Sequence, residues 1–444
     1  MKKIQQSHPD LAIALLLVCL WVLLLAFPAR SAEPGLNRLD VESAQAIALE
    51  KNPTIAAARE RLAQAAARVA EARSAWWPQL SAQAGVSRIE LSDRRMAGSE
   101  TANPEDWYNA ELKASWLVFD GLSREYGVAA AGHGKNAGTA AWADARRLLN
   151  QGVAHAFLDH QLAREEERIA QADLEFYERL VAEAQARLDA GSGSQSDLLG
   201  IRVRANEARA LLIETRRLVD TSLAALAELM AIDPGDLAHM DFTPLPDETD
   251  ADFATPARAS LLQTALQNRP DLQRAREETA AATAEANAAR GEYFPQLLLT
   301  GSYGAERSQN ASFRDDDAGS TVGIALSFPL FEGGRIRAKV EQARSRQRET
   351  EFASQSLQNT VGSEVSYALS SLAAAQQQLL LQAENLEVVR QVRNLVQLEY
   401  QAGQETLVRL NEAQRDFITA ESRHARARTH LRRAWIDVET VSGE

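Results

Sequence analysis

The hydrophobic and polar positions of the chain change period several times, which predicts long helices alternating with short strands. Residues 39–77 and 256–294 are rich in Ala, Arg, Glu and Gln, which are strong helix formers, so each stretch is predicted to be a helix. A proline ends each stretch, and the residues that follow, 79–86 and 296–303, alternate between apolar and polar side chains. The alternation predicts a strand in each half of the chain.

A second strand is predicted in each half. Polar segments with turn residues come next, and further strand-like stretches follow them at 107–119 and 320–331. Each half of the chain is therefore expected to form one β-hairpin with an outer loop, the first over 79–119 and the second over 296–331.

After each hairpin the helical pattern returns for about 70 residues, which at about 1.5 Å per residue makes a helix of roughly 105 Å. The sequence predicts long helices over 121–190 and 333–402. Beyond a glycine, a shorter return helix is predicted in each half, over 192–231 and 404–438. A long helix and its return helix are expected to form a helical hairpin.

The long helices repeat apolar residues at alternating spacings of three and four, which is typical of a coiled coil. In the second half this seam consists of Val361, Val365, Ala368, Leu372, Ala375, Leu379, Gln382, Leu386, Val389, Arg393 and Val396. The matching positions 212 residues earlier are Leu149, Val153, Ala156, His160, Ala163, Glu167, Ala170, Leu174, Tyr177, Val181 and Ala184. The seam is thus duplicated, with a few polar interruptions.

Short motifs repeat as well. The sequence Trp-Trp-Pro-Gln-Leu at 76–80 resembles Tyr-Phe-Pro-Gln-Leu at 293–297, 217 residues later. The chain is therefore predicted to consist of two repeats, 33–231 and 258–444. Between them, residues 232–257 contain four prolines among acidic residues, which predicts a linker that breaks helices.

The first residues have the pattern of a secretory signal peptide. Lys2 and Lys3 precede an apolar run over 11–27, and small residues near Ser31 offer a cleavage site. We predict that residues 1–32 are a signal peptide and that the protein is exported. The alternative is a membrane anchor, since an apolar run of this length can just span a bilayer.

Composition excludes several classes of protein. With 25% charged residues and a mean hydropathy of −0.30, the chain is not a polytopic helical membrane protein. Its single cysteine, Cys19, excludes a disulfide framework. A net charge of −13 argues against nucleic-acid binding, which needs clustered basic residues. The histidines are scattered and no phosphate loop or nucleophile motif is present, so the sequence predicts no enzyme, metal site or cofactor.

The order of these elements identifies a family. Together with the Phe-Glu-Gly-Gly-Arg sequence at 331–335 and Tyr-Gln-Ala-Gly at 400–403, the duplicated arrangement resembles the TolC-like outer membrane efflux and secretion proteins. The resemblance covers the whole mature chain. It implies a mainly α fold with a small β part, in which duplicated long helical hairpins form a periplasmic tunnel. It also implies a homotrimer in which four strands per chain complete a twelve-stranded barrel in the lipid of the cell outer membrane.

The resemblance implies a function too. The protein would be the exit duct of a tripartite efflux pump or a type I secretion system, working with a periplasmic adaptor (membrane fusion) protein and an inner-membrane transporter. The alternative is a soluble periplasmic coiled-coil adaptor or scaffold protein of an efflux complex. Such adaptors carry one helical hairpin between β-rich modules, so two hairpins and two strand pairs favour the duct.

Physical reasoning supports the barrel independently. Open sheet edges are not tolerated in lipid, so the predicted hairpins need partner chains to close a barrel. Aromatic residues also gather at the predicted strand ends, where a barrel has its interfacial girdle, although aromatics at the corners of an ordinary core would give the same pattern. The girdle candidates are Trp76, Trp77, Trp107, Tyr108, Trp116, Tyr293 and Phe294.

The resemblance also implies a periplasmic gate between the helical hairpins. Asp197 and Tyr400 stand where the family places two linking residues, whereas Glu405 stands where its best-known member has a linking arginine. Arg409 and Glu412 occupy two positions that are both acidic in that member. Because they are three residues apart on a helix, they are expected to pair, which leaves a constriction without net charge. The alternative is that Arg409 points away from the lumen.

The tips of the two helical hairpins are predicted at Gly191 and Gly403. A left-handed residue is expected where each long helix ends, and glycine adopts that conformation at little cost. The resemblance implies that these tips contact the adaptor protein at the periplasmic end of the tunnel.

Overall fold

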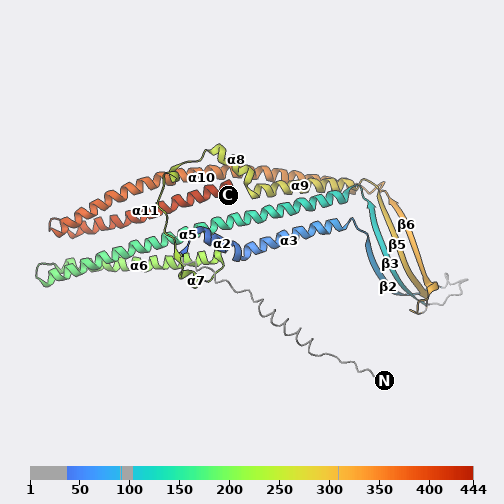
Figure 1. The fold of residues 1–444 in the computed structure, drawn as a ribbon, viewed down its shortest axis with the longest axis horizontal. Coiled ribbons are helices and arrows are strands. Elements are labelled where there is room, and N and C mark those ends of the chain that lie inside the picture. Colours follow the sequence, from blue (N-terminus) through green and yellow to red (C-terminus); the bar gives the residue numbers. More distant parts are fainter. Residues whose placement is uncertain (1–37, 91, 93–103, 309, 444) are drawn as a thin grey trace, which may run out of the picture.

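A computed structural model describes residues 38–90, 92, 104–308 and 310–443 (Figure 1). It shows an elongated molecule in which long helices run side by side and a small sheet lies at one end. The predicted fold class, mainly helical with a small β part, is confirmed. The predicted signal peptide, residues 1–32, lies outside the described residues.

The helices of the two halves match in length. The first half contains α2 (Val41–Lys51), α3 (Pro53–Ser74), α5 (Ser123–Asp189) and α6 (Gln195–Met230), and the second contains α8 (Arg258–Asn268), α9 (Pro270–Gly291), α10 (Arg335–Gln401) and α11 (Leu407–Ser442). Taken pairwise in this order, the helices are 11, 22, 67 and 36 residues long in both halves. The repeated sequence thus forms a repeated set of helices.

The prediction of one continuous helix over 39–77 and another over 256–294 is wrong. Each stretch is broken where a residue with extended backbone, Asn52 or Arg269, precedes a proline. A proline ring disfavours the helical conformation of the residue before it, so the helix must restart. Asn52 then caps the new helix, because its Oδ1 accepts a hydrogen bond from the Thr54 amide at 2.8 Å.

The predicted coiled-coil seams are confirmed. Every seam position on α5 and α10 is buried or half-buried, and α5 packs on α6 while α10 packs on α11. The two hairpins meet where α5 contacts α11. There, Gln414 Nε2 donates a hydrogen bond of 2.7 Å to the buried carboxylate of Asp173. Within the described residues, no helix has the length and apolar character needed to cross a membrane.

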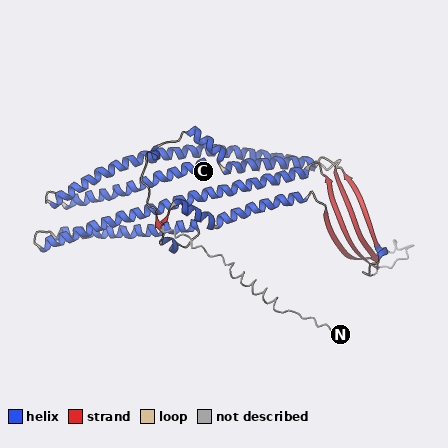
Figure 2. Ribbon diagram, in the orientation of Figure 1, coloured by secondary structure: helices blue, strands red, loops and turns tan. Residues whose placement is uncertain are grey.

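The sheet has four strands, antiparallel throughout, in the order β2-β3-β5-β6 (Figure 2). Their bounds are β2 (Gln79–Ile89), β3 (Glu105–Phe119), β5 (Gln296–Ser308) and β6 (Ala318–Ser327), with a short 3-10 helix, η2 (Asp315–Asp317), before β6. The second hairpin ends at Ser327 and not at 331, because Pro329 cannot donate a ladder hydrogen bond. The central β3–β5 pair joins the two halves of the chain.

The proline-rich segment between the halves has more structure than its sequence predicts. It contains α7 (Pro234–Ala238), β4 (Asp241–Phe242) and a 3-10 helix, η1 (Asp250–Phe253), and β4 pairs in parallel with β1 (Arg38–Leu39). Arginines of α11 bind its acidic side chains: Arg428 Nε lies 2.6 Å from Glu248 Oε1, and Arg432 Nη1 lies 2.6 Å from Asp252 Oδ1. These ion pairs hold the segment against the helices.

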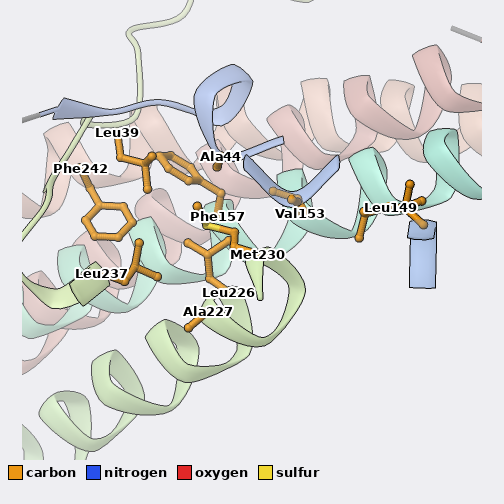
Figure 3. Close-up of a cluster of buried hydrophobic side chains, with 12 residues drawn as sticks. Leu39, Ala44, Leu149, Val153, Phe157, Leu226, Ala227, Met230, Leu237 and Phe242 are labelled. Carbon is orange, nitrogen blue, oxygen red and sulfur yellow. The ribbon is translucent and has the colours of Figure 1, made fainter. Parts of the chain in front are cut away.

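A hydrophobic core forms where this segment crosses the first helical hairpin (Figure 3). Leu39 of β1 and Phe242 of β4 lie over Phe157 of α5, and the two phenylalanine rings are 5.6 Å apart between centroids. Leu226 and Met230 of α6 belong to the same cluster, and both are fully buried. The core therefore joins the start of the described chain, the first hairpin and the segment between the halves.

His160 lies at the edge of this core with its ring 4.4 Å from that of Phe242. Its Nδ1 is 3.1 Å from the Ser222 hydroxyl oxygen, and the side chain is buried. Burial, helped by the nearby Arg164 guanidinium, lowers the pKa of the His160 imidazole to about 4. The folded protein thus keeps His160 neutral at a pH where the unfolded chain would protonate it.

Replacing His160 by glutamine is expected to weaken the pH dependence of stability between about pH 6.5 and 4. In the wild type, stability is full above the unfolded pKa of about 6.5 and falls as the pH drops toward the folded value of about 4. Thermal unfolding of the purified protein at pH 7.5 and 5 measures this change. An unchanged dependence in His160→Gln would contradict the assignment.

Candidate functional site

The two faces of the sheet differ in polarity. Cross-strand partners in the observed register put apolar side chains of all four strands on one face, where they are between 39 and 81% exposed. This apolar face consists mainly of Leu80, Val86, Leu112, Trp116, Tyr303, Val322, Ile324 and Leu326. The other face carries Ser81, Gln83, Asn109, Glu111, Lys113, Thr300, Ser302 and Thr321. One sheet face thus suits lipid and the other suits water.

The predicted girdle residues fall at the two ends of the sheet. Five of them lie at the end joined to the helices, namely Trp76, Trp77, Trp116, Tyr293 and Phe294, and all five are exposed. Trp107 and Tyr108 lie at the far end. The register puts Tyr108 on the apolar face but Trp107, opposite Ser87 and Ser308, on the polar face. Trp107 therefore does not share a face with the others on the strands.

Arg124, which sequence reasoning missed, fastens the sheet to the helices. It is buried at the start of α5, and its guanidinium stacks on the Trp76 ring, 4.4 Å from the centroid. The same group donates hydrogen bonds to the carbonyl oxygens of Ala75 at 3.2 Å and Val118 at 2.9 Å. A lone arginine in a helical pattern gives no sign of this role, because its partners come from the ends of α3 and β3.

The two helical tips have the same geometry. Gly191 and Gly403 adopt left-handed φ values of +76° and +74°, which confirms the expected conformation. The next residue donates its amide back into the last helical turn, from Ser192 to the Arg187 carbonyl at 2.9 Å and from Gln404 to the Glu399 carbonyl at 2.8 Å. Figure 1 shows both tips at the end of the molecule opposite the sheet.

The predicted gate residues lie close to these tips. Arg409 Nη1 is 3.5 Å from Glu412 Oε2 on the first turns of α11, so the expected pair forms. Asp197 is exposed in the first turn of α6, and Glu405 accepts a hydrogen bond from the Thr406 amide just before α11. Tyr400 is half-buried in the last turn of α10.

The structure adds a basic residue to this group, Arg187, in the last turn of α5. Its guanidinium stacks over the Tyr400 ring, 5.4 Å from the centroid, and so joins the two hairpins. Burial raises the pKa of the Tyr400 hydroxyl, and the charges of Arg187 and Asp197 act on it in opposite directions. Arg187 therefore puts a positive charge beside Tyr400, although position 405, where a linking arginine was considered, is a glutamate. Sequence reasoning missed it because Arg187 and Tyr400 come from different halves of the chain.

Among the residues that the structure describes, no three His, Cys, Asp or Glu side chains are arranged to hold a metal ion. The apolar sheet face lies at one end of the molecule and the two helical tips lie at the other.

Comparison with known sequences gives the family. The sequence profile of the family described as "Outer membrane efflux protein" matches residues 46–231 and 261–444. The chain is 28% identical to the pyoverdine export outer membrane protein OpmQ of Pseudomonas aeruginosa over 393 residues, covering 87% of this chain and 81% of OpmQ. It is 25% identical to protein CyaE of Bordetella pertussis over 418 residues, covering 93% of this chain and 86% of CyaE.

Solved structures share the fold. The outer membrane protein VceC of Vibrio cholerae superposes with a TM-score of 0.79 at 18% identity, over 91% of this chain and 96% of VceC. The CmeC outer membrane channel of Campylobacter jejuni gives a TM-score of 0.80 at 18% identity, over 91% of this chain and 85% of CmeC. The chain therefore belongs to the outer membrane efflux protein family, the TolC-like outer membrane components of efflux pumps and secretion systems.

Proposed function

We propose that three copies of this chain form an exit duct, with a twelve-stranded barrel in the outer membrane and a helical tunnel in the periplasm. The observation that carries this proposal is the sheet of four strands with one apolar and one polar face. An apolar face of this size costs free energy in water but is stable against lipid. In the same assignment, the chain is two repeats, 33–231 and 258–444, joined by the segment 232–257.

The open sheet edges support a closed assembly of several chains. Within the described residues, β2 and β6 each pair on one side only. In lipid, unpaired backbone amides and carbonyls cost several kcal/mol each, so the outer edge of β6 must meet a β2 strand. A sheet of four strands is too narrow to close on itself, and pairing with further copies satisfies both edges.

The spacing of aromatic residues supports the membrane placement. Tyr108 and Trp116 share the apolar face of β3 and are eight residues apart, about 27 Å along the strand. At a strand tilt of ~40° the separation along a barrel axis is roughly 20 Å, comparable with the ~25 Å apolar band of such barrels. We assign Trp116 to the periplasmic girdle, with Trp76, Trp77, Tyr293 and Phe294 at the same end, and Tyr108 to the outer one.

The duct would serve either a tripartite efflux pump or a type I secretion system. Its relatives point both ways, since OpmQ is named for pyoverdine export and AprF, 30% identical over 206 residues, for alkaline protease secretion. The tips at Gly191 and Gly403 would contact a periplasmic adaptor, and an inner-membrane transporter would load the duct. No observation on this chain favours the adaptor alternative, and its family assignment opposes it.

The residues near the tips would form the gate. Asp197, Tyr400, Glu405, Arg409 and Glu412 lie at the narrow end of such a tunnel if three copies close around one axis. Arg187 would hold the two hairpins of one copy together through its contact with the Tyr400 ring, 5.4 Å away. Arg187 would thus supply the positive charge that a linking arginine would otherwise provide when the gate is closed.

Detergent-extracted protein is expected to run at three times its chain mass and to form discrete ion channels in planar bilayers. Its circular dichroism spectrum should be dominated by helix. Extraction from outer-membrane fractions followed by light scattering measures the mass, and single-channel recording measures conductance. A monodisperse monomer that is stable without detergent would contradict the proposal.

A further inference from the structure

One side of α11 carries charged residues from the predicted gate pair onward, away from the tip. Buried alanines recur along this helix at intervals of seven residues, namely Ala413, Ala420, Ala427 and Ala434. This is the period of a coiled coil, in which residues seven or fourteen positions apart share one side of the helix. Arg423 and Arg426 therefore lie on the same side as Arg409 and Glu412.

The two arginines form a second charged level beyond the gate pair. Arg423 and Arg426 are exposed, and each lies 14 residues beyond its counterpart in the gate pair, Arg409 or Glu412. At about 1.5 Å per residue the two levels are roughly 21 Å apart along the helix. Between them, the exposed Asp416 lies on the same side, about 10 Å from the level of Arg423.

A groove between α10 and α11 runs along these arginines. Its volume is about 640 Å³, and its wall on α11 includes Arg423, Arg426 and His430. The facing wall on α10 is uncharged and consists of Ser371, Ala374, Ala375, Gln378 and Gln382. The nearest carboxylate of α10 in sequence, Glu384, is two residues beyond Gln382 and so about 200° away around the helix. No carboxylate of the facing wall thus offsets the arginines.

The charges of the two arginines remain available to the groove. Arg426 Nε lies 2.6 Å from Glu166 Oε1, but the Glu166 side chain is 12% exposed whereas that of Arg426 is 58% exposed. The guanidinium therefore covers the carboxylate and is itself turned to solvent. Arg423 has no ion-pair partner in the part of the chain that the structure describes. Each copy thus has one net positive charge at this level of the groove.

The opposite side of α11 binds the segment between the halves. Arg428, which pairs with Glu248, is two residues from Arg426 and so about 160° away around the helix. On α5 and α6, arginines pair with glutamates near the same level, for example Arg209 Nη2 with Glu178 Oε1 at 2.8 Å. Such pairs carry no net charge, so they do not offset Arg423.

We propose that Arg423 and Arg426 of three copies form a cationic ring inside the tunnel, and that this ring favours anionic cargo with carboxylate, phosphate or sulfate groups. A guanidinium suits such groups because it donates two parallel hydrogen bonds to them. The Asp416 carboxylates lie about one Debye length away at 0.1 M salt, so they weaken the potential of the ring without cancelling it. The inference rests on the proposed function and adds the class of cargo to it.

Block of single channels by pyrophosphate, a multivalent anion, tests the ring. Pyrophosphate should block the wild type in planar bilayers, and Arg423→Gln should weaken the block by about tenfold, because three charges leave the ring. Arg423→Lys keeps the charge and should keep most of the block. The matched control is Arg164→Gln, which removes an exposed arginine of α5 from the side that holds the segment between the halves. Its block should equal that of the wild type.

Thiol labelling measures the same potential without a bilayer. Gln378 is exposed on the uncharged wall of the groove, so Gln378→Cys in a Cys19→Ser background places one thiol there. In purified trimers this thiol should react faster with a negatively charged methanethiosulfonate than with a positively charged one. Adding Arg423→Gln should lower the ratio of the two rates several-fold, and high salt should lower it in the parent as well.

The outcomes separate the ring from the duct. Channels whose pyrophosphate block is equal in the wild type and Arg423→Gln would overturn the ring and leave the proposed function standing. Equal losses of block in Arg423→Gln and Arg164→Gln would show an effect of overall charge and would also overturn it. If Arg423→Gln does not assemble, equal labelling of Gln378→Cys by both reagents overturns the ring. Monomers in detergent that form no channels would overturn both proposals.

Discussion

Export is expected to fall to the level of a strain without the protein when Gly191 and Gly403 are both replaced by valine, while trimers still insert. Both glycines have left-handed φ values, +76° and +74°, at which a side chain costs about 1–2 kcal/mol, and β-branching adds to it. A Cβ at either position meets no heavy atom within 4 Å, so the cost is backbone strain and not a clash. The strain is relieved by reshaping the turn that is proposed to contact the adaptor.

Two control variants separate the turn conformation from the loss of glycine as such. Asparagine tolerates the left-handed region, so the double variant Gly191→Asn with Gly403→Asn should keep most export. Valine at Gly200, an exposed helical position without positive φ, should also be tolerated. Export by whole cells and the amount of trimer in outer-membrane fractions are the two measurements. If the valine variants were instead missing from outer-membrane fractions and the remaining export was unchanged, the tips would have a structural role only.

Cation selectivity is expected to rise strongly in Arg409→Asp. The Arg409 and Glu412 side chains are 3.5 Å apart and each is half exposed, so in a ring of three copies the pair contributes no net charge. The substitution turns each neutral pair into two carboxylates. Multivalent cations bind oxygen ligands more tightly as the number of carboxylates grows, so block by a trivalent cation should strengthen by about tenfold or more.

Planar-bilayer recordings of the wild type and the variant measure this effect. Arg415→Asp makes the same change in charge six residues later, about 1.7 turns along α11 and about 120° away around it, so it should alter block far less. The ion pair itself contributes little to stability, since exposed pairs on helices are worth about 0.3–0.5 kcal/mol. Identical conductance and block in the wild type and Arg409→Asp would mean that residue 409 points away from the lumen.

Much of the fold follows from local patterns in the sequence. The long helices, their seams and the two hairpins of strands were predictable because periods of 3.5 and 2 report which face of an element is buried. The left-handed tip glycines and the pair of Arg409 with Glu412 were also predictable. Each depends only on residues within one or two helical turns. The breaks at Asn52 and Arg269 were missed because the helix-forming composition on both sides concealed the effect of one proline.

Contacts between distant segments were not predictable. Arg187 stacks on Tyr400 from another half of the chain, and Arg124 binds carbonyl oxygens at the ends of two other elements. The segment between the halves is ordered because arginines of α11 neutralise its acidic side chains, whereas its composition alone indicates only a break in helix. Which distant segment supplies these partners depends on how the helices and strands pack in the folded protein.

The sequence by itself determined the class of fold, the duplication, the lengths of the long helices and the family. Each of these follows from the periodicity of apolar residues or from short motifs. Only the tertiary structure decided that β3 pairs with β5 between the two halves, that Trp107 turns to the polar face, and that α5 contacts α11. The physical reason is that a period fixes the buried face of each element but carries no information about its neighbour. Neighbours are selected by packing and hydrogen bonding between segments far apart in the chain.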